Sequence, residues 1–137
     1  FAPCSTAWKR VRELKPELEL HNLPDTVHPG TLGHYLNLCC FYSAMTGKSP
    51  QGLTATVVAW PRFGSFDKAE ADRRLQNVKL DPYESALPGF MRRMTAMQSE
   101  VHLDDETAGL LQRTAWNTWQ DIRRSLAMAG VNSNVGR

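Results

Sequence analysis

Apolar residues recur at helical spacing in several stretches of the chain, most clearly from about Thr31 to Met45. Gly47 and Pro50 follow this stretch and are typical of a helix end. Apolar side chains in it point in nearly every direction around the helix axis instead of forming one stripe. A helix that is apolar all round must be covered on more than one side. We therefore expect this helix to lie at the centre of the fold.

Weaker patterns predict further elements on both sides of the central helix. We expect additional helices from Ser5 or Thr6 to Leu14, from Asp67 to Val78, from Tyr83 to Glu100 with an interruption near Pro88, and from Asp104 or Asp105 to about Gly130. Short strands are predicted at Glu17 to His21 and within Leu53 to Trp60. The wide apolar stripe of the last helix predicts that it packs on the helix beginning at Thr31.

Composition narrows the function classes only slightly. The chain has 137 residues, 42% of them hydrophobic and 22% charged, with a net charge of +2, which is ordinary for one globular domain. Basic residues are scattered among acidic ones, so we expect no nucleic-acid partner. No apolar run approaches the roughly 18 residues of a membrane span. We interpret Cys39 and Cys40 as small buried hydrophobic residues.

An Asp and a His three residues apart, Asp25 and His28, lie in the loop before the central helix. An Asp in this position can hold the imidazole in one tautomer and leave its other nitrogen free as a general base. By itself the spacing is weak evidence, because Asp25 could equally cap a turn and His28 lie on the surface. The residues around the pair favour the catalytic interpretation over the structural one.

Residues 25–52 carry a longer pattern that includes this pair. D-x-x-H-P leads into G-x-Y-L and then into a helix closed by G-x-S-P, and this order resembles the end of the SGNH (GDSL-like) hydrolases. The matching segments are Asp25 to Leu36, Phe41-Tyr42 and Thr46 to Gly52, with flanks at Ala2-Pro3, Ala7-Trp8, Leu111-Gln112 and Ala115-Trp116. The resemblance implies that His28 is the general base of a Ser-His-Asp triad and that Asp25 orients it. His34 is interpreted as structural or surface-exposed.

The resemblance also implies a fold and a division of the chain. We expect the C-terminal part of an α/β/α, flavodoxin-like SGNH fold, with the residues present mainly helical and carrying few short strands. Residues 1–52 would be the domain part with the D-x-x-H loop, 53–103 a mostly helical insertion of uncertain role, and 104–130 a helix packing back on the domain.

The chain departs from the SGNH family because its nucleophile is missing. The family's serine and oxyanion-hole residues precede the Asp and His. We interpret Gly64-Ser65 and the Gly130 to Ser133 stretch as coincidental likenesses. Without nucleophile and oxyanion donors most of the rate is lost. We expect this chain alone to be inactive and the serine to come from a missing N-terminal segment or a partner chain.

The sequence gives little support for metal, cofactor or phosphate binding. The four His have no zinc spacing, the cysteines form no C-x-x-C and there is no phosphate-binding glycine loop, so we expect neither metal nor cofactor. Aromatic residues that could form a sugar platform, but are more often core, are Trp60, Trp116 and Trp119.

The sequence therefore predicts part of an acyl-ester hydrolase acting on a small ester or an acetylated sugar. The alternative is a non-catalytic helical module that dimerises or binds another protein through its uncovered apolar surface. A third reading recruits Ser65 or another serine to the pair in a rearranged fold. The sequence names no compartment.

Overall fold

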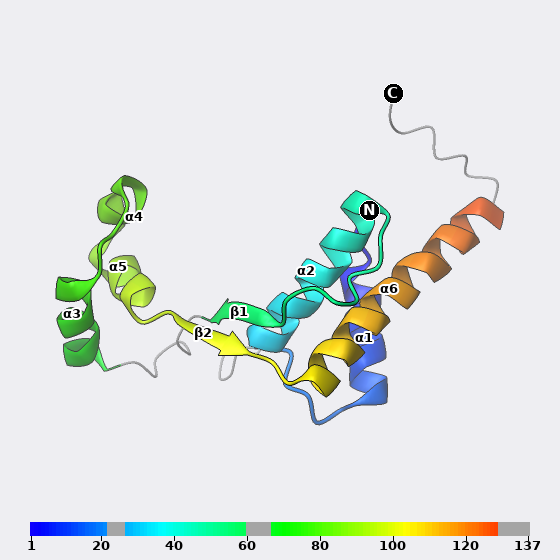
Figure 1. Ribbon diagram of the computed structural model, residues 1–137, viewed down its shortest axis with the longest axis horizontal. Helices are drawn as coiled ribbons and strands as arrows, with labels where there is room; N and C mark the ends of the chain where they lie inside the picture. The colour runs from blue at the N-terminus through cyan, green and yellow to red at the C-terminus, as the bar shows by residue number, and fades with distance from the viewer. Residues whose placement is uncertain (22–26, 60–66, 129–137) are drawn as a thin grey trace.

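The computed structural model describes residues 1–21, 27–59 and 67–128, and this part of the chain is mainly helical with two short antiparallel strands (Figure 1). The elements are α1 (Cys4–Leu14), α2 (Thr31–Thr46), β1 (Thr56–Ala59), α3 (Lys68–Asn77), α4 (Pro82–Ala86), α5 (Gly89–Ala96), β2 (Ser99–His102) and α6 (Asp105–Met128). The mainly helical character and the few short strands agree with the sequence-based expectation.

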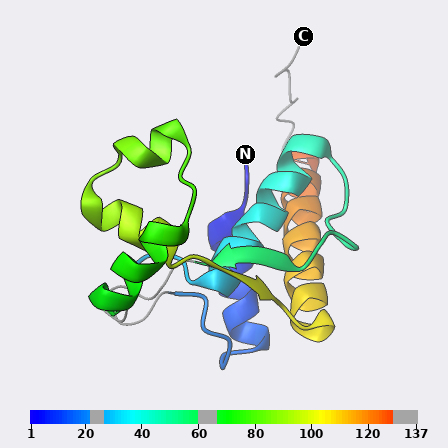
Figure 2. The ribbon, with the colours of Figure 1, turned by 60° about the vertical axis from the view of Figure 1, so that its left-hand side comes forward.

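The core lies where α1, α2 and α6 pack on one another. Helix α6 runs along α2, as its apolar stripe predicts, and α1 packs against both (Figure 2). Leu36 of α2, Val11 of α1 and Leu111 of α6 are fully buried there, and Cys39 and Cys40 join them as buried apolar residues, as predicted. This cluster covers one side of α2.

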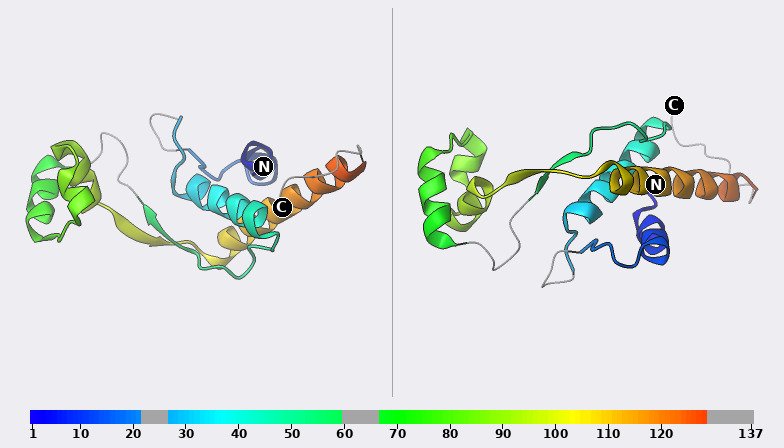
Figure 3. Two further views of the ribbon diagram at one scale, coloured as in Figure 1. Left: turned by 90° about the horizontal axis from the view of Figure 1, so that it is seen from above. Right: turned by 60° about the horizontal axis from the view of Figure 1, so that its bottom comes forward.

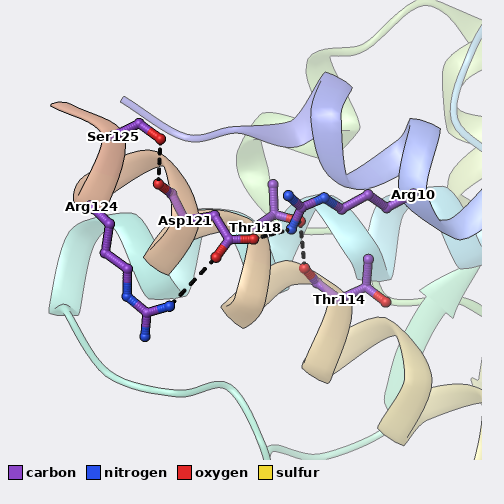
Figure 4. A network of polar contacts seen from close by, with 6 residues as sticks. All are labelled: Arg10, Thr114, Thr118, Asp121, Arg124 and Ser125. Carbon is purple, nitrogen blue, oxygen red and sulfur yellow. Dashed lines mark hydrogen bonds and ion pairs between the residues drawn. The ribbon is translucent and has the colours of Figure 1, made fainter. Parts of the chain in front are cut away.

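Polar contacts fix α1 to α6 at the side of the core. The Arg10 guanidinium donates to Thr118 Oγ1 at 3.3 Å and lies 2.8 Å from Asp121 Oδ2 (Figure 4). Thr118 in turn donates to the Thr114 carbonyl at 2.7 Å, so its buried hydroxyl is fully engaged. A charge-assisted contact of this geometry favours one orientation of α1 on α6.

The ends of α2 follow local signals. Gly47 lies in the left-handed region at φ 68° and its N–H donates to the Ser43 carbonyl, which closes the helix as predicted. The side of α2 away from the core keeps its large apolar side chains exposed. Leu38 is 58% exposed, Phe41 49% and Met45 84%. We call Leu38, Phe41 and Met45 the α2 stripe.

Residues between α2 and α6 form a helical unit on a β ribbon. Strands β1 and β2 pair antiparallel from Thr56↔His102 to Ala59↔Ser99. The ribbon leads from the core to α3, α4 and α5, and α5 packs on α3 and α4 at its far end (Figure 3). Asp67 caps α3 and Asp81 forms a capping box at α4.

Two sequence predictions fail in this region and before α2. Glu17 to His21 form no strand, because only His21 finds a partner, a single bridge to Pro29. The helix predicted to reach Glu100 ends at Ala96, because the residues from Ser99 pair with β1 instead. In both places the outcome depends on whether a neighbouring strand is present, which local patterns do not report.

No helix in the described ranges has the length and apolar character needed to cross a membrane.

Candidate functional site

His28 lies at the end of a loop whose two ends are held together. His21 and Pro29 form an antiparallel bridge, and the Gly30 N–H donates to the Leu20 carbonyl at 2.8 Å. Gly30 is also the N-cap of α2, so His28 comes two residues before the helix cap. The His28 side chain is exposed. Asp25 belongs to residues 22–26, outside the described residues, so its position relative to His28 is not part of the description.

Trp8 connects α1 to both the loop and α2. Its indole Nε1–H donates to Asn37 Oδ1 at 2.8 Å. Its ring lies edge-on to the His21 ring, with the centroids 4.6 Å apart. Because Asn37 belongs to α2 and His21 to the bridge that closes the loop, this one side chain holds three segments together.

Gly33 provides the space that Trp8 needs. A Cβ at Gly33 would overlap the backbone oxygen of Leu20 and would lie 2.6 Å from Trp8 Cζ2. Any larger residue would therefore push the loop or the indole away from α2. Gly33 is inside a helix, where glycine is otherwise unfavourable by about 1 kcal/mol relative to alanine. Its presence there is explained by this close approach.

An open groove of about 710 Å³ runs between α1 and the loop. We call it the Trp8 groove; its lining includes Trp8 and Arg12 of α1, Asn37 of α2, and His21, Val27 and Pro29. Val27 and Pro29 are the direct neighbours of His28 in the chain. The groove thus adjoins the segment that carries His28, although His28 itself is not among its lining residues.

The thiols are not suited to act as nucleophiles at neutral pH. Burial raises the pKa of Cys39 to about 12 and raises the pKa values of Cys40 and Cys4 above the ordinary thiol value. The thiolate is the nucleophilic form of cysteine. At neutral pH these groups are protonated and chemically quiet, which agrees with the interpretation of Cys39 and Cys40 as packing residues.

The other histidines have separate surroundings. His34 is exposed on the first turns of α2, as the surface interpretation predicts. His102 Nδ1 lies 3.1 Å from Thr56 Oγ1 across the β ribbon. Within the described ranges no group of three or more His, Cys, Asp or Glu side chains is arranged to hold a metal ion.

A second, smaller groove of about 320 Å³ lies at the C-terminal ends of α2 and α6. Trp116 and Trp119 stack there with centroids 5.0 Å apart, and the Arg123 guanidinium covers Trp119 at 4.7 Å. Trp119 is 9% exposed and belongs to the core rather than to an open platform. Trp60, the third aromatic considered for a sugar platform, lies outside the described residues.

Of the serine alternatives, Ser65 and Ser133 also lie outside the described residues.

Comparison with protein-family models, with curated proteins and with solved structures finds no significant match. The SGNH resemblance therefore rests on the residues quoted above.

The roles of His21 and Asn37, which help to hold the loop, are not apparent from the sequence. Their contacts join residues far apart in the chain, so no local pattern reports them. Gly33 did leave a signal, since a glycine within a strongly predicted helix is unfavourable unless something packs against it.

Proposed function

We propose that this chain is the C-terminal part of an SGNH-type serine ester hydrolase, in which His28 is the general base and Asp25 orients it. A serine from a separate N-terminal segment attacks the ester carbonyl while His28 takes its proton. His28 then returns the proton to the leaving alcohol, and water releases the acyl group by the same path. Acetylated carbohydrate is the proposed substrate class.

The observation that carries this proposal is the bracing of the His28 loop. A general base must be held in place on a rigid support, since small displacements reduce the rate strongly. The His21–Pro29 bridge, the Leu20–Gly30 hydrogen bond and the Trp8–Asn37 contact give His28 such a support while leaving it exposed. An open groove adjoins the same segment through Val27 and Pro29.

The α2 stripe supports the proposal from packing. Leu38, Phe41 and Met45 present three large apolar side chains on one side of the central helix. In an α/β/α fold a helix at this place packs on a parallel sheet. We propose that the segment carrying the serine supplies this sheet and covers the stripe.

The test is an assay of the complete polypeptide, taken as the intact natural product together with its encoded upstream sequence. Hydrolysis of p-nitrophenyl acetate and of acetylated xylan is measured for the parent, for His28→Ala and for His34→Ala. We expect a loss of at least about 10³-fold for His28→Ala and little change for His34→Ala, a second exposed histidine six residues along the chain. Equal activity of parent and His28→Ala would reject the proposal.

The nucleophile is tested separately with a fluorophosphonate, which labels activated serines. Labelling at one serine before residue 1, lost in His28→Ala, supports the proposed triad. Labelling at Ser65 would instead favour the rearranged arrangement.

The α2 stripe also favours a second candidate function, a non-catalytic helical module that associates through this surface. A stable dimer of the chain, dissociated by Phe41→Asp but not by Val58→Asp, together with absence of esterase activity in the complete polypeptide, would favour this candidate. Val58 is a matched control because it is apolar and 59% exposed on β1.

A further inference from the structure

We propose that the Trp8 groove binds a sugar ring, with the indole of Trp8 as the platform, and so holds the carbohydrate part of the substrate beside His28. The identification of the sugar as part of an ester rests on the proposed function. The groove itself is defined by side chains from α1, the loop and α2.

Trp8 has a fixed orientation, which favours its use as a platform. Its Nε1–H is held by Asn37 Oδ1, its ring centroid lies 4.6 Å from that of the His21 ring at an interplanar angle of 62°, and the space above Gly33 accepts its six-membered ring. An aromatic side chain fixed before binding loses little conformational entropy when a ligand stacks on it.

The lining of the Trp8 groove combines an aromatic side chain with polar and charged ones. Ser5, Arg12 and Glu13 bring hydroxyl, guanidinium and carboxylate groups to the groove that Trp8 lines. A pyranose ring has apolar C–H faces and a polar rim of hydroxyls, which suits one aromatic face surrounded by donors and acceptors. An aliphatic acyl chain would bury these charged groups without giving them partners, which is unfavourable.

The charges on the wall of the Trp8 groove favour a neutral ligand. Lys9 Nζ lies 3.9 Å from Glu13 Oε1, so one positive charge on this wall already has a negative neighbour. The groove therefore lacks the concentration of positive charge that a phosphate or a polyanionic chain requires. A neutral sugar fits this balance better.

The groove at Trp116 and Trp119 is less suited to a sugar ring than the Trp8 groove. The groove beside Trp116 and Trp119 has less than half the volume, and Arg123 already occupies the Trp119 face. The Trp8 groove falls in the size range of about 300–1,000 Å³ typical of ligand sites. It also borders the neighbours of His28, whereas the smaller groove is lined by residues of α6 and Gly47.

The test follows the indole N–H signals of the full chain by NMR during titration with xylotetraose and, separately, with N-acetylated chitotetraose. Assignments come from single Trp→Phe variants. We expect the Trp8 signal to move and saturate at millimolar concentration, with the Trp116 signal unchanged. Arg12→Ala, which removes an exposed side chain of the groove, should weaken binding at least about 3-fold. Arg113→Ala, an exposed arginine on α6, should leave binding unchanged.

Movement of the Trp116 or Trp119 signal alone, or no movement of any indole signal up to about 20 mM sugar, would overturn the proposal. So would movement of Trp8 with ethyl butyrate but with neither sugar, because the groove would then take the acyl part. The titration needs no catalysis. A chain that binds sugar at Trp8 while the complete polypeptide keeps its activity in His28→Ala would retain the sugar site and reject the hydrolase.

Discussion

Gly33 of α2 lies directly against the indole ring of Trp8 in α1, and this contact brings the His28 loop close to the helix that follows it. A Cβ at Gly33 would approach Trp8 Cζ2 to 2.6 Å and would overlap the Leu20 carbonyl oxygen. The Leu20 oxygen also accepts the hydrogen bond from Gly30. One missing side chain thus links the packing of two helices to the closure of the loop.

Replacing Gly33 by alanine should destabilise the protein. Alanine favours the helix by about 1 kcal/mol, but the added Cβ meets backbone and a fixed ring, which costs about 1–3 kcal/mol or more. We expect a net loss of up to about 2 kcal/mol in the free energy of unfolding, measured by urea denaturation. The matched control is Gly109→Ala in α6, where the Cβ would meet only the Arg113 guanidinium at 2.9 Å. That side chain can move, so Gly109→Ala should stabilise by about 0.5–1 kcal/mol. Equal effects of the two variants would contradict the packing argument.

Gln112 joins α6 to α2 and to the segment before β1. Its Nε2 donates to Tyr35 Oη at 2.7 Å and to the Leu53 carbonyl at 3.1 Å, and its Oε1 accepts from the Gly52 N–H at 3.2 Å. Gln112→Leu should cost about 1–3 kcal/mol of unfolding free energy, because backbone groups lose their partners. Tyr35→Phe should cost about 1 kcal/mol.

The double variant separates the pair from its surroundings. If the Gln112–Tyr35 contact matters, the cost in the double variant will be smaller than the sum of the single costs by about 0.5 kcal/mol or more. Additive costs would show that the two side chains act independently.

The buried thiols predict a loss of stability in alkali. Unfolded cysteine has a pKa of about 8.5, whereas burial raises the pKa of Cys39 to about 12 in the fold and raises that of Cys40 as well. Their contribution is complete below the unfolded pKa and decreases as pH rises toward the folded pKa. Each such thiol lowers the unfolding free energy by up to about 1.4 kcal/mol per pH unit in that range.

Urea denaturation at pH 7, 8.5 and 10 with a phosphine reductant tests this dependence. Cys39→Ala should have a shallower decrease between pH 8.5 and 10 than the parent, whereas Ser49→Ala, without a titrating group, should follow the parent. A parent and a Cys39→Ala variant with the same pH slope would show that this thiol does not contribute.

The helical unit beyond the β ribbon should be separable from the core. Among the described residues, the buried cluster of α1, α2, β1 and α6 includes none from 67 to 98. Ala59 and Ser99 are paired, so an Asn-Gly turn can join them in place of residues 60–98. We expect the shortened chain to keep a single cooperative thermal transition and helical circular dichroism. Loss of the transition would mean that the unit supports the core.

Asp25 should matter for turnover and not for folding. In the complete polypeptide, Asp25→Asn keeps the side-chain shape but holds the wrong His28 tautomer, so kcat should fall by about 10⁴-fold with the melting temperature unchanged. The control is Asp81→Asn in the exposed capping box of α4, which should leave kcat unchanged. Unchanged turnover in Asp25→Asn would remove Asp25 from the triad.

Local sequence patterns predict the helices whose ends have local causes. Gly47 ends α2, Asp67 begins α3, and Pro88 with Gly89 separates α4 from α5. The sequence also indicated that α6 packs on α2 and that Cys39 is buried. Capping and amphipathic spacing act within a few residues, so they can be recognised without knowing the rest of the fold.

The sequence also supplied the hypothesis of an Asp25–His28 pair, which stays a prediction. The tertiary structure alone decided how the His28 loop is held, through His21 with Pro29 and Trp8 with Asn37. It also decided that the residues from Ser99 form a strand and that Leu38, Phe41 and Met45 stay exposed. These features depend on which distant segment lies alongside, and that is set by the packing of the whole chain rather than by local spacing.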